Sequence, residues 1–147
     1  MISRRVLASL GLGVLGGAAV AAAPARAAAP LEIVARRKQI TLPQVPAIGG
    51  TYIATFTLTD PAGAALGEAA AHTALVDVTP EGPVMLSQVV LKLRDGEVHY
   101  QRIMNRFGPF PRTAVGAIVG ATGAHAGRTG AVDITWPDAD TIKIKLP

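Results

Sequence analysis

Five polar side chains share the apolar faces of strand-like segments, which makes them candidates for chemistry inside a core. They are Tyr52, Ser87, Tyr100, Arg102 and Trp136. Arg102 is the most unusual, because in period-two alternation it follows Val98 and Tyr100 on the same face. A buried guanidinium without a partner is energetically costly. Arg102 is therefore expected to be paired, to reach solvent along its stem, or to bind an anionic ligand.

The tyrosines and the tryptophan have a simpler interpretation beside the functional one. Tyr52, Tyr100 and Trp136 could pack as core residues with their polar tips at a rim. If they face a ligand instead, Tyr52 or Tyr100 could donate a hydrogen bond, and Arg102 could stabilise an oxyanion. Both interpretations require strands that hold these residues on one face.

The segments that would position these residues are short strands joined by local turns. The clearest is a hairpin of residues 84–94 and 97–106 joined at Asp95-Gly96. Residues 31–40, 51–59, 132–136 and 142–146 alternate in the same manner, whereas 41–50 is rich in proline and glycine and predicts an irregular connection. Residues 67–79 could begin as a helix, but their β-branched content favours a strand. The aromatics of 107–110 are expected to cover one end of the structure.

Glycines are dense between residues 116 and 130, at Gly116, Gly120, Gly123, Gly127 and Gly130. Glycine adopts positive φ freely, so this density predicts a tight, bulged connection between two strands. A glycine-rich loop can also bind phosphate. This one lacks the P-loop lysine and a following helix, which disfavours that interpretation.

The series G-A-T-G-A-H-A-G-R-T-G, residues 120–130, resembles the G-G-T-G-x-Y-x-G-A-x-G motif of the allene oxide cyclase and dirigent superfamily. The resemblance extends over residues 31–146 and includes V-x-L-x-L-R-D-G-E-V at 89–98 and L-T-D-P-A-G-A-A-L-G-E at 58–68. These stretches are also similar to bacterial barrel cyclases of polyketide pathways. His125 stands where the family more often has an aromatic residue.

The resemblance implies an all-β fold, a single antiparallel eight-stranded barrel with a ligand in its mouth. Strand periodicity alone would also fit a β-sandwich. Barrel closure removes exposed sheet edges, and a small barrel can hold one apolar molecule. The plant relatives assemble into trimers, so a homo-oligomer, dimer or trimer, is expected.

The resemblance also adds two candidate site residues. The stretch L-E-I-V, 31–34, is similar to the first barrel strand of plant allene oxide cyclases, where an acidic residue takes part in catalysis, and it suggests Glu32. Val34 replaces the expected asparagine, and Thr73 corresponds to a family cysteine. The expected catalytic residues are thus Glu32, Tyr100 and Arg102, with Tyr52, Thr73, Ser87 and Trp136 binding substrate. Glu32 is expected to pair with Arg102 or to anchor a ligand in the pocket.

Several kinds of site are disfavoured by the sequence. The three histidines are widely separated and fit no metal-ligand spacing, and no nucleophile-elbow motif is present. The chain has no cysteine, so disulfides and thiol chemistry are excluded. No cofactor is expected.

The first residues resemble an export signal. Ser3-Arg4-Arg5 begins a twin-arginine pattern, an apolar Gly/Ala-rich stretch follows, and Ala25-Arg26-Ala27 is a small-residue cleavage site. An uncleaved membrane anchor is the alternative. Residues 1–27 are therefore interpreted as a signal peptide and 28–147 as one barrel domain, exported to the periplasm or the medium.

Charge does not point to nucleic acid. The full chain has a net charge of +4, but Arg4, Arg5 and Arg26 fall within the signal and no acidic residue does. The mature chain is nearly neutral, and its one basic cluster, residues 36–38, is equally well explained as a solvated strand edge.

These observations lead to one functional expectation and one alternative. The barrel is expected to bind a small, largely apolar molecule and to steer its cyclisation or stereoselective coupling, mostly by confinement. The alternative is a non-catalytic exported binding protein or a structural, oligomer-forming barrel.

Overall fold

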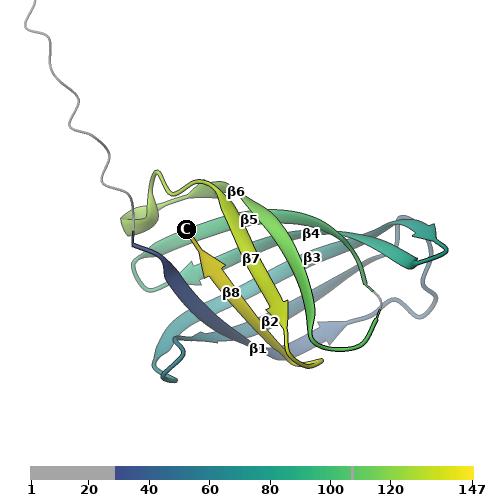
Figure 1. Ribbon diagram of the computed structural model, residues 1–147, viewed down its shortest axis with the longest axis horizontal. Helices are drawn as coiled ribbons and strands as arrows, with labels where there is room; N and C mark the ends of the chain where they lie inside the picture. Colours follow the sequence, from purple (N-terminus) through teal and green to yellow (C-terminus); the bar gives the residue numbers. More distant parts are fainter. Residues whose placement is uncertain (1–28, 107) are drawn as a thin grey trace, which may run out of the picture.

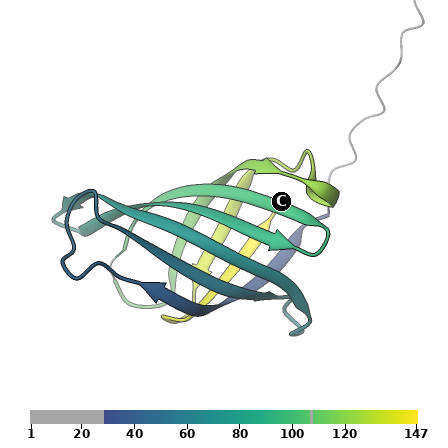
Figure 2. The same cartoon turned by 180° about the vertical axis from the view of Figure 1, so that it is seen from behind.

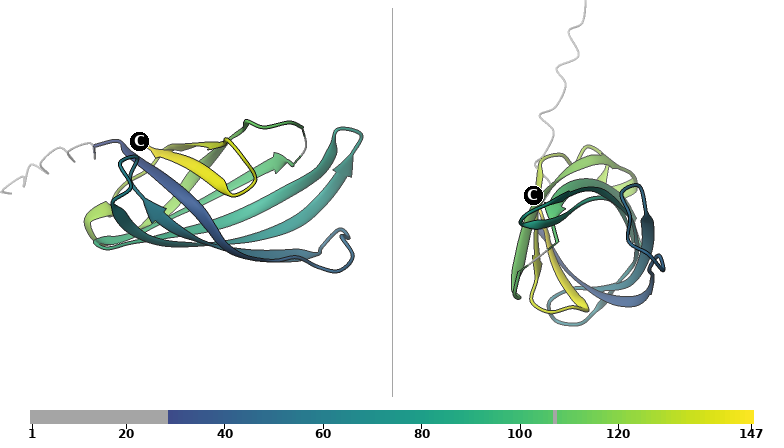
Figure 3. Two further views of the ribbon diagram at one scale, coloured as in Figure 1. Left: turned by 90° about the horizontal axis from the view of Figure 1, so that it is seen from below. Right: turned by 90° about the vertical axis from the view of Figure 1, so that its right-hand side faces the viewer.

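The chain folds into a closed barrel of eight antiparallel strands that follow one another in chain order (Figures 1 and 3). This is a computed structural model in which residues 29–106 and 108–147 are described. The strands are β1 (Leu31–Thr41), β2 (Thr51–Thr59), β3 (Ala65–Thr79), β4 (Gly82–Leu93), β5 (Gly96–Asn105), β6 (Arg112–Ala121), β7 (Ala131–Trp136) and β8 (Thr141–Leu146). The predicted barrel is confirmed, and the sandwich alternative does not form. The predicted signal peptide and Phe107 lie outside the described residues.

The barrel closes because its last strand pairs with its first. Leu31 lies opposite Leu146, and Arg36 lies opposite Thr141. Residues 67–79, whose helical alternative stayed open in the sequence, belong to the long strand β3. The predicted hairpin is β4 and β5, in register from Val84 opposite Asn105 to Leu93 opposite Gly96. Each of the eight strands that the structure describes therefore has a neighbour on both sides.

One end of the barrel is filled by large apolar side chains. Leu58, Leu91, Val98 and Leu146 are at most 1% exposed. Each such burial contributes roughly 1.5–3 kcal/mol, so this end supplies much of the core. Towards the other end the inward positions of β2 and β3 carry Ala54 and Ala71, whose small side chains leave more interior space.

The glycine-rich stretch lies at the filled end and packs against the β4–β5 turn. It contains a short 3-10 helix, η1 (Gly123–His125), between β6 and β7. Gly123 has φ +60°, and a Cβ there would lie 2.2 Å from the Asp95 carbonyl oxygen of the β4–β5 turn. Ala124 N donates to the same oxygen at 2.8 Å. Because Gly123 has no Cβ, the backbones of the two turns can lie in direct contact. The three-residue helix η1 is not the α-helix that a phosphate-binding loop requires.

The opposite end is open and is extended by two segments that lie side by side. The β3–β4 hairpin and the connection between β1 and β2 both project beyond the other strands (Figures 1 and 2). They are joined by backbone hydrogen bonds from Gly49 N to Leu75 O and from Leu75 N to Gly50 O, at 2.8 and 2.9 Å. Among the described residues, no helix is long and apolar enough to cross a membrane.

Candidate functional site

Four polar side chains form one row across adjacent strands at the open end of the barrel. Tyr52 on β2 is the register partner of Thr73 on β3, Thr73 of Ser87 on β4, and Ser87 of Arg102 on β5. Direct cross-strand partners project from the same face of a sheet. All four line one pocket, together with Trp136 at the end of β7. The sequence suggested each of these residues individually as a site residue, and the strand register brings them to one pocket.

The middle of this row is a hydroxyl pair. Thr73 Oγ1 and Ser87 Oγ lie 3.0 Å apart, and the two residues are 2% and 1% exposed. Buried hydroxyls need partners, and each of these supplies the other's. In this contact one hydroxyl donates and the other accepts, so each oxygen has a partner and the pair makes a polar patch in the pocket wall.

Arg102 is the residue of the row whose hydrogen bonds are missing. Its guanidinium carbon lies 4.2 Å from the centre of the Trp136 ring. Its Nε and Nη1 atoms are buried and have no hydrogen-bond partner among the described residues. Burial lowers the pKa of Arg102 from its ordinary value, although a guanidinium remains cationic at neutral pH. The cation is thus held by an aromatic face and keeps free N–H donors.

Tyr52 at the other end of the row is bound to a second arginine. Arg106 Nη1 donates to the Tyr52 hydroxyl oxygen at 2.8 Å, and its guanidinium carbon lies 5.1 Å from the Tyr52 ring centre. Arg106 follows β5 and also lines the pocket. The Tyr52 hydroxyl proton remains available for a further acceptor, because the hydroxyl accepts this bond.

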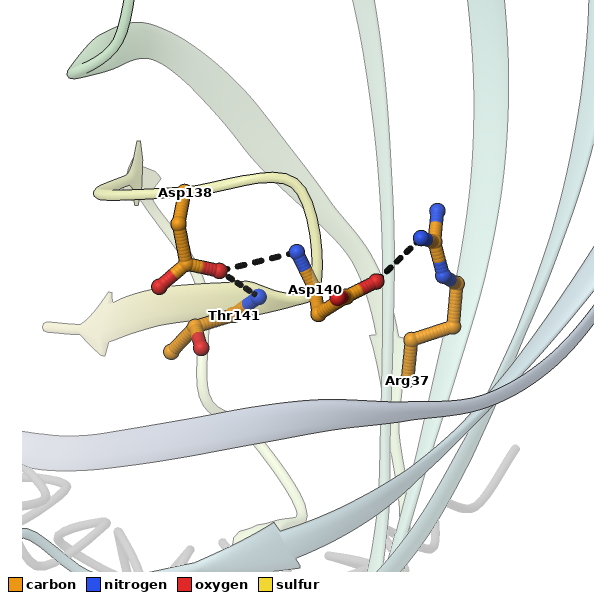
Figure 4. Close-up of polar contacts among 4 residues, drawn as sticks. All are labelled: Arg37, Asp138, Asp140 and Thr141. Carbon is orange, nitrogen blue, oxygen red and sulfur yellow. Dashed lines mark hydrogen bonds and ion pairs between the residues drawn. The ribbon is translucent and has the colours of Figure 1, made fainter.

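Two further arginines lie at the mouth of the pocket. Arg37 on β1 forms an ion pair with Asp140 in the β7–β8 turn (Figure 4). Arg112 Nε donates to the Gly108 carbonyl oxygen at 2.9 Å, and its guanidinium carbon lies 4.2 Å from the Phe110 ring centre. Of the two aromatics expected to cover a barrel end, Phe110 lines the pocket, and Phe107 lies outside the described residues.

The β7–β8 turn is itself built around a carboxylate. Asp138 Oδ1 accepts from the backbone N–H groups of Asp140 and Thr141, both at 2.8 Å (Figure 4). These hydrogen bonds, the one from Asp140 first, lower the pKa of Asp138. Asp138 thereby fixes the turn that presents Asp140 to Arg37.

Tyr100 lies one layer deeper than the polar row and does not line the pocket. It is 1% exposed, and burial raises the pKa of its phenol. Gly116 on β6 makes room for it, because a Cβ there would lie 3.2 Å from Tyr100 Cδ2 and 2.9 Å from the Gln101 carbonyl oxygen. Tyr100 supports the floor beneath Arg102, which differs from the direct catalytic contact expected from the sequence.

Glu32 lies outside the barrel. Its neighbours Leu31 and Ile33 pack with the core, and Glu32 alternates to the outer face, where its side chain is 62% exposed. There Glu32 Oε1 lies 4.0 Å from Lys145 Nζ on β8. The expected pair with Arg102 does not form, and Glu32 is not among the residues of the pocket.

Three arginines of the pocket were not recognised from the sequence. Arg106 continues the alternation of Tyr100, Arg102 and Met104, so its inward position could have been predicted. Arg37 likewise continues Ile33 and Ala35 up to the register shift between Arg37 and Gln39, and it points to the mouth instead of forming a solvated edge. Arg112 follows the irregular segment after β5, where no pattern indicates its direction.

The chemistry of the lining is cationic and aromatic. Among the described residues, the lining contains four arginines and no aspartate, glutamate or histidine. Within residues 29–106 and 108–147, no group of three or more His, Cys, Asp or Glu could hold a metal ion. The pocket can donate hydrogen bonds to an oxygen and stabilise negative charge, but its lining offers no carboxylate or imidazole as a general base.

Comparison with known proteins finds no matching family model and no matching curated protein. Among solved structures, the fold is similar to that of a pyocyanin demethylase, with a TM-score of 0.69, 18% identity and coverage of 81% of this chain and 98% of the other. It is also similar to AbnU, an exo-specific intermolecular Diels-Alderase, with a TM-score of 0.67, 15% identity and coverage of 81% and 97%. At these identities the likeness establishes the shared barrel fold.

Proposed function

We propose that this protein binds a small molecule in the open end of the barrel and steers its cyclisation. The observation that carries the proposal is Arg102, a buried cation in the pocket, two of whose nitrogen atoms have no hydrogen-bond partner among the described residues. Keeping such a group desolvated is costly for folding, and a bound oxygen would offset that cost. The two similar barrels, named for a Diels-Alder reaction and a demethylation, lend support because each is named for chemistry on a small organic molecule.

The proposed mechanism relies on confinement and on Arg102 as an electrophilic donor. The pocket walls hold the reacting end of the substrate in the conformer that closes the ring, which lowers the entropic part of the barrier. Arg102 donates to a substrate carbonyl or enolate oxygen, where negative charge grows as the new bond forms. A pericyclic ring closure converts π bonds of one molecule into a new σ bond with the remaining π electrons rearranged, so no new charge persists on the product and no atom or proton leaves. It therefore needs neither a general base nor a co-reactant.

The resemblance to the allene oxide cyclase and dirigent superfamily belongs to this proposal, as does export by the twin-arginine route. Glu32 has no part in the proposed site. The catalytic role passes to Arg102, with Tyr52, Thr73, Ser87 and Trp136 as binding residues and Tyr100 as the support beneath them.

Turnover is tested with a small-molecule extract of the source organism and with three proteins: wild type, Arg102→Met and Glu32→Gln. Cyclisation conserves molecular mass, so liquid chromatography with mass spectrometry should show one compound replaced by an isomer. Wild type and Glu32→Gln should convert it, and Arg102→Met should be at least about tenfold slower, since a hydrogen bond from a charged donor contributes roughly 1.5–3 kcal/mol. Equal conversion by Arg102→Met would refute the proposed role.

A non-catalytic carrier is the second candidate, and one observation favours it. The pocket lining lacks aspartate, glutamate and histidine, the usual proton-transfer groups. A carrier would retain a compound from the extract through Arg102 and return it unchanged. The same experiment separates the two functions, because only a cyclase produces the isomer.

A structural role through self-association remains a third proposal. Leu86 and Ile103 are register partners on the outer face of β4 and β5, and they are 37% and 63% exposed. Adjacent exposed apolar side chains of this kind favour association with a second copy. Light scattering of wild type and Ile103→Asp would show a loss of oligomer in the variant if this face is the interface.

A further inference from the structure

The charge of the pocket lining is strongly one-sided. Of its four arginines, Arg37 is paired with the carboxylate of Asp140, while Arg106 and Arg112 donate to a hydroxyl and a carbonyl oxygen. Within the part of the chain that the structure describes, Arg102, Arg106 and Arg112 have no carboxylate partner. Like charges gathered around one pocket repel each other, and a bound anion would relieve that repulsion.

A second, apolar groove adjoins this pocket. It lies between the β1–β2 connection and the β3–β4 hairpin, and three residues, Tyr52, Met85 and Arg106, line both spaces. The remaining lining of the groove is apolar or glycine: Leu42, Pro43, Pro46, Ala47, Gly50, Leu75 and Pro83. The backbone bonds of Gly49 and Gly50 to Leu75 hold its walls together. The groove is thus built into the fold.

The volumes of the pocket and the groove favour a ligand that places one part in each of them. The pocket encloses about 120 Å³ and the groove about 230 Å³. A cavity of about 150 Å³ holds benzene, and the pocket is somewhat smaller, so it takes a head group no larger than about one ring and not a whole multi-ring or long-chain molecule. The rest of such a ligand must leave the pocket, and the groove that shares Tyr52, Met85 and Arg106 offers it an apolar surface.

We propose that the ligand is an elongated, acidic amphipathic molecule whose anionic oxygen binds Arg102 and whose apolar part lies in the groove beneath the β1–β2 connection. This inference rests on the proposed function of the same pocket. The anion is a carboxylate, enolate or phenolate, each of which accepts hydrogen bonds from a guanidinium. The Arg106–Tyr52 pair stands where head and tail meet, and its Tyr52 hydroxyl faces the passing ligand as a second donor.

The test uses octanoate, 1-octanol and butyrate as probes and Trp136, the only tryptophan in the chain, as the reporter. Octanoate has both parts of the proposed ligand, octanol lacks the charge, and butyrate lacks the tail. Titration of the mature protein should show Trp136 fluorescence responding to octanoate with a Kd at least about tenfold lower than to either other probe, since a charge-assisted bond contributes roughly 1.5–3 kcal/mol.

Two variants separate the head from the tail. Arg102→Met should weaken the binding of octanoate until its Kd equals that of octanol, and the Kd of octanol should stay unchanged. Ala47→Phe fills the groove from an exposed position, so it should weaken the binding of octanoate until its Kd equals that of butyrate and leave the Kd of butyrate unchanged. Leu42→Asn should also weaken the binding of octanoate. Glu32→Gln on the outer face is the matched control and should bind as wild type does.

Several outcomes would overturn the inference. They are equal binding of octanoate and octanol by wild type, unchanged octanoate binding by Ala47→Phe and Leu42→Asn, and no binding of octanoate at millimolar concentration. The outcome is independent of turnover. Arg102-dependent conversion of a neutral compound would support the cyclase function and refute the acidic ligand. Octanoate binding of the expected pattern without any conversion would support the acidic ligand and refute the cyclase function.

Discussion

Arg102 on β5 lies with its guanidinium carbon 4.2 Å from the ring centre of Trp136 on β7, while its Nε and Nη1 atoms have no hydrogen-bond partner in the described part of the chain. The aromatic face holds the cation in place without consuming its N–H donors. Folding therefore keeps a charged donor desolvated at the open end of a barrel. Such an arrangement is typical of sites whose groups are satisfied by a ligand.

Replacing Arg102 by methionine should separate stability from binding. The substitution removes a desolvated charge that has no carboxylate partner among the described residues, and methionine fills similar volume, so the free energy of unfolding should stay within about 1 kcal/mol of wild type or rise. Binding of an anionic probe should weaken by at least about tenfold. Urea denaturation and Trp136 fluorescence titration measure the two effects. A loss of several kcal/mol would instead identify Arg102 as a structural residue.

The Thr73–Ser87 hydroxyl pair should behave as a coupled unit. Thr73→Val or Ser87→Ala alone leaves the other hydroxyl buried without its partner and should cost roughly 1–3 kcal/mol. The double variant removes both polar groups and should cost less than the sum of the single changes. A double-mutant cycle of denaturant unfolding tests this, and strict additivity would mean that the 3.0 Å contact is not an energetic pair.

Alternation is a local property of each strand, so the sequence predicted which residues of the β4–β5 hairpin face inward. The choice of a barrel over a sandwich came from the family resemblance and not from alternation. The sequence did not predict that Tyr52, Thr73, Ser87 and Arg102 form one row, since register depends on turn lengths and on irregularities such as the shift between Leu75 and Asp77. Alternation places Glu32 outward next to Ile33, so the family resemblance misdirected that prediction. The partner of Arg37, Asp140, comes from a distant turn and carries no local signal. Arg112 contacts Gly108 and Phe110 of the irregular segment just before it, whose conformation no periodic pattern predicts.

The glycine-rich stretch should tolerate alanine at one position and not at another. Gly123→Ala places a Cβ at 2.2 Å from the Asp95 carbonyl oxygen with φ at +60°, whereas Gly120 has nothing within 4 Å of a Cβ. Gly123→Ala is expected to cost at least about 2 kcal/mol, and Gly120→Ala less than about 1 kcal/mol or to stabilise. Thermal unfolding of the two variants provides the comparison. Equal melting temperatures would contradict the close contact of the two turns.

Asp138 should make the open end sensitive to acid. Its pKa in the folded protein is lowered from the ordinary 3.8, so its carboxylate stabilises the fold above that pH, and the contribution is lost as the pH falls through the folded-state pKa. Asp138→Asn keeps an acceptor oxygen but no charge. The melting temperature of wild type should exceed that of Asp138→Asn at pH 7, and the difference should shrink below pH 3.8. A difference independent of pH would exclude the charge as its cause.

The most direct measurement is retention of a natural ligand. Mature wild type, Arg102→Met and Glu32→Gln are each incubated with a small-molecule extract of the source organism, separated from free compounds by gel filtration, and examined by native mass spectrometry. The pocket described here predicts one acidic compound retained by wild type and by Glu32→Gln and lost from Arg102→Met. Retention of the same compound by all three proteins, or of none by wild type, would contradict a ligand site built on Arg102.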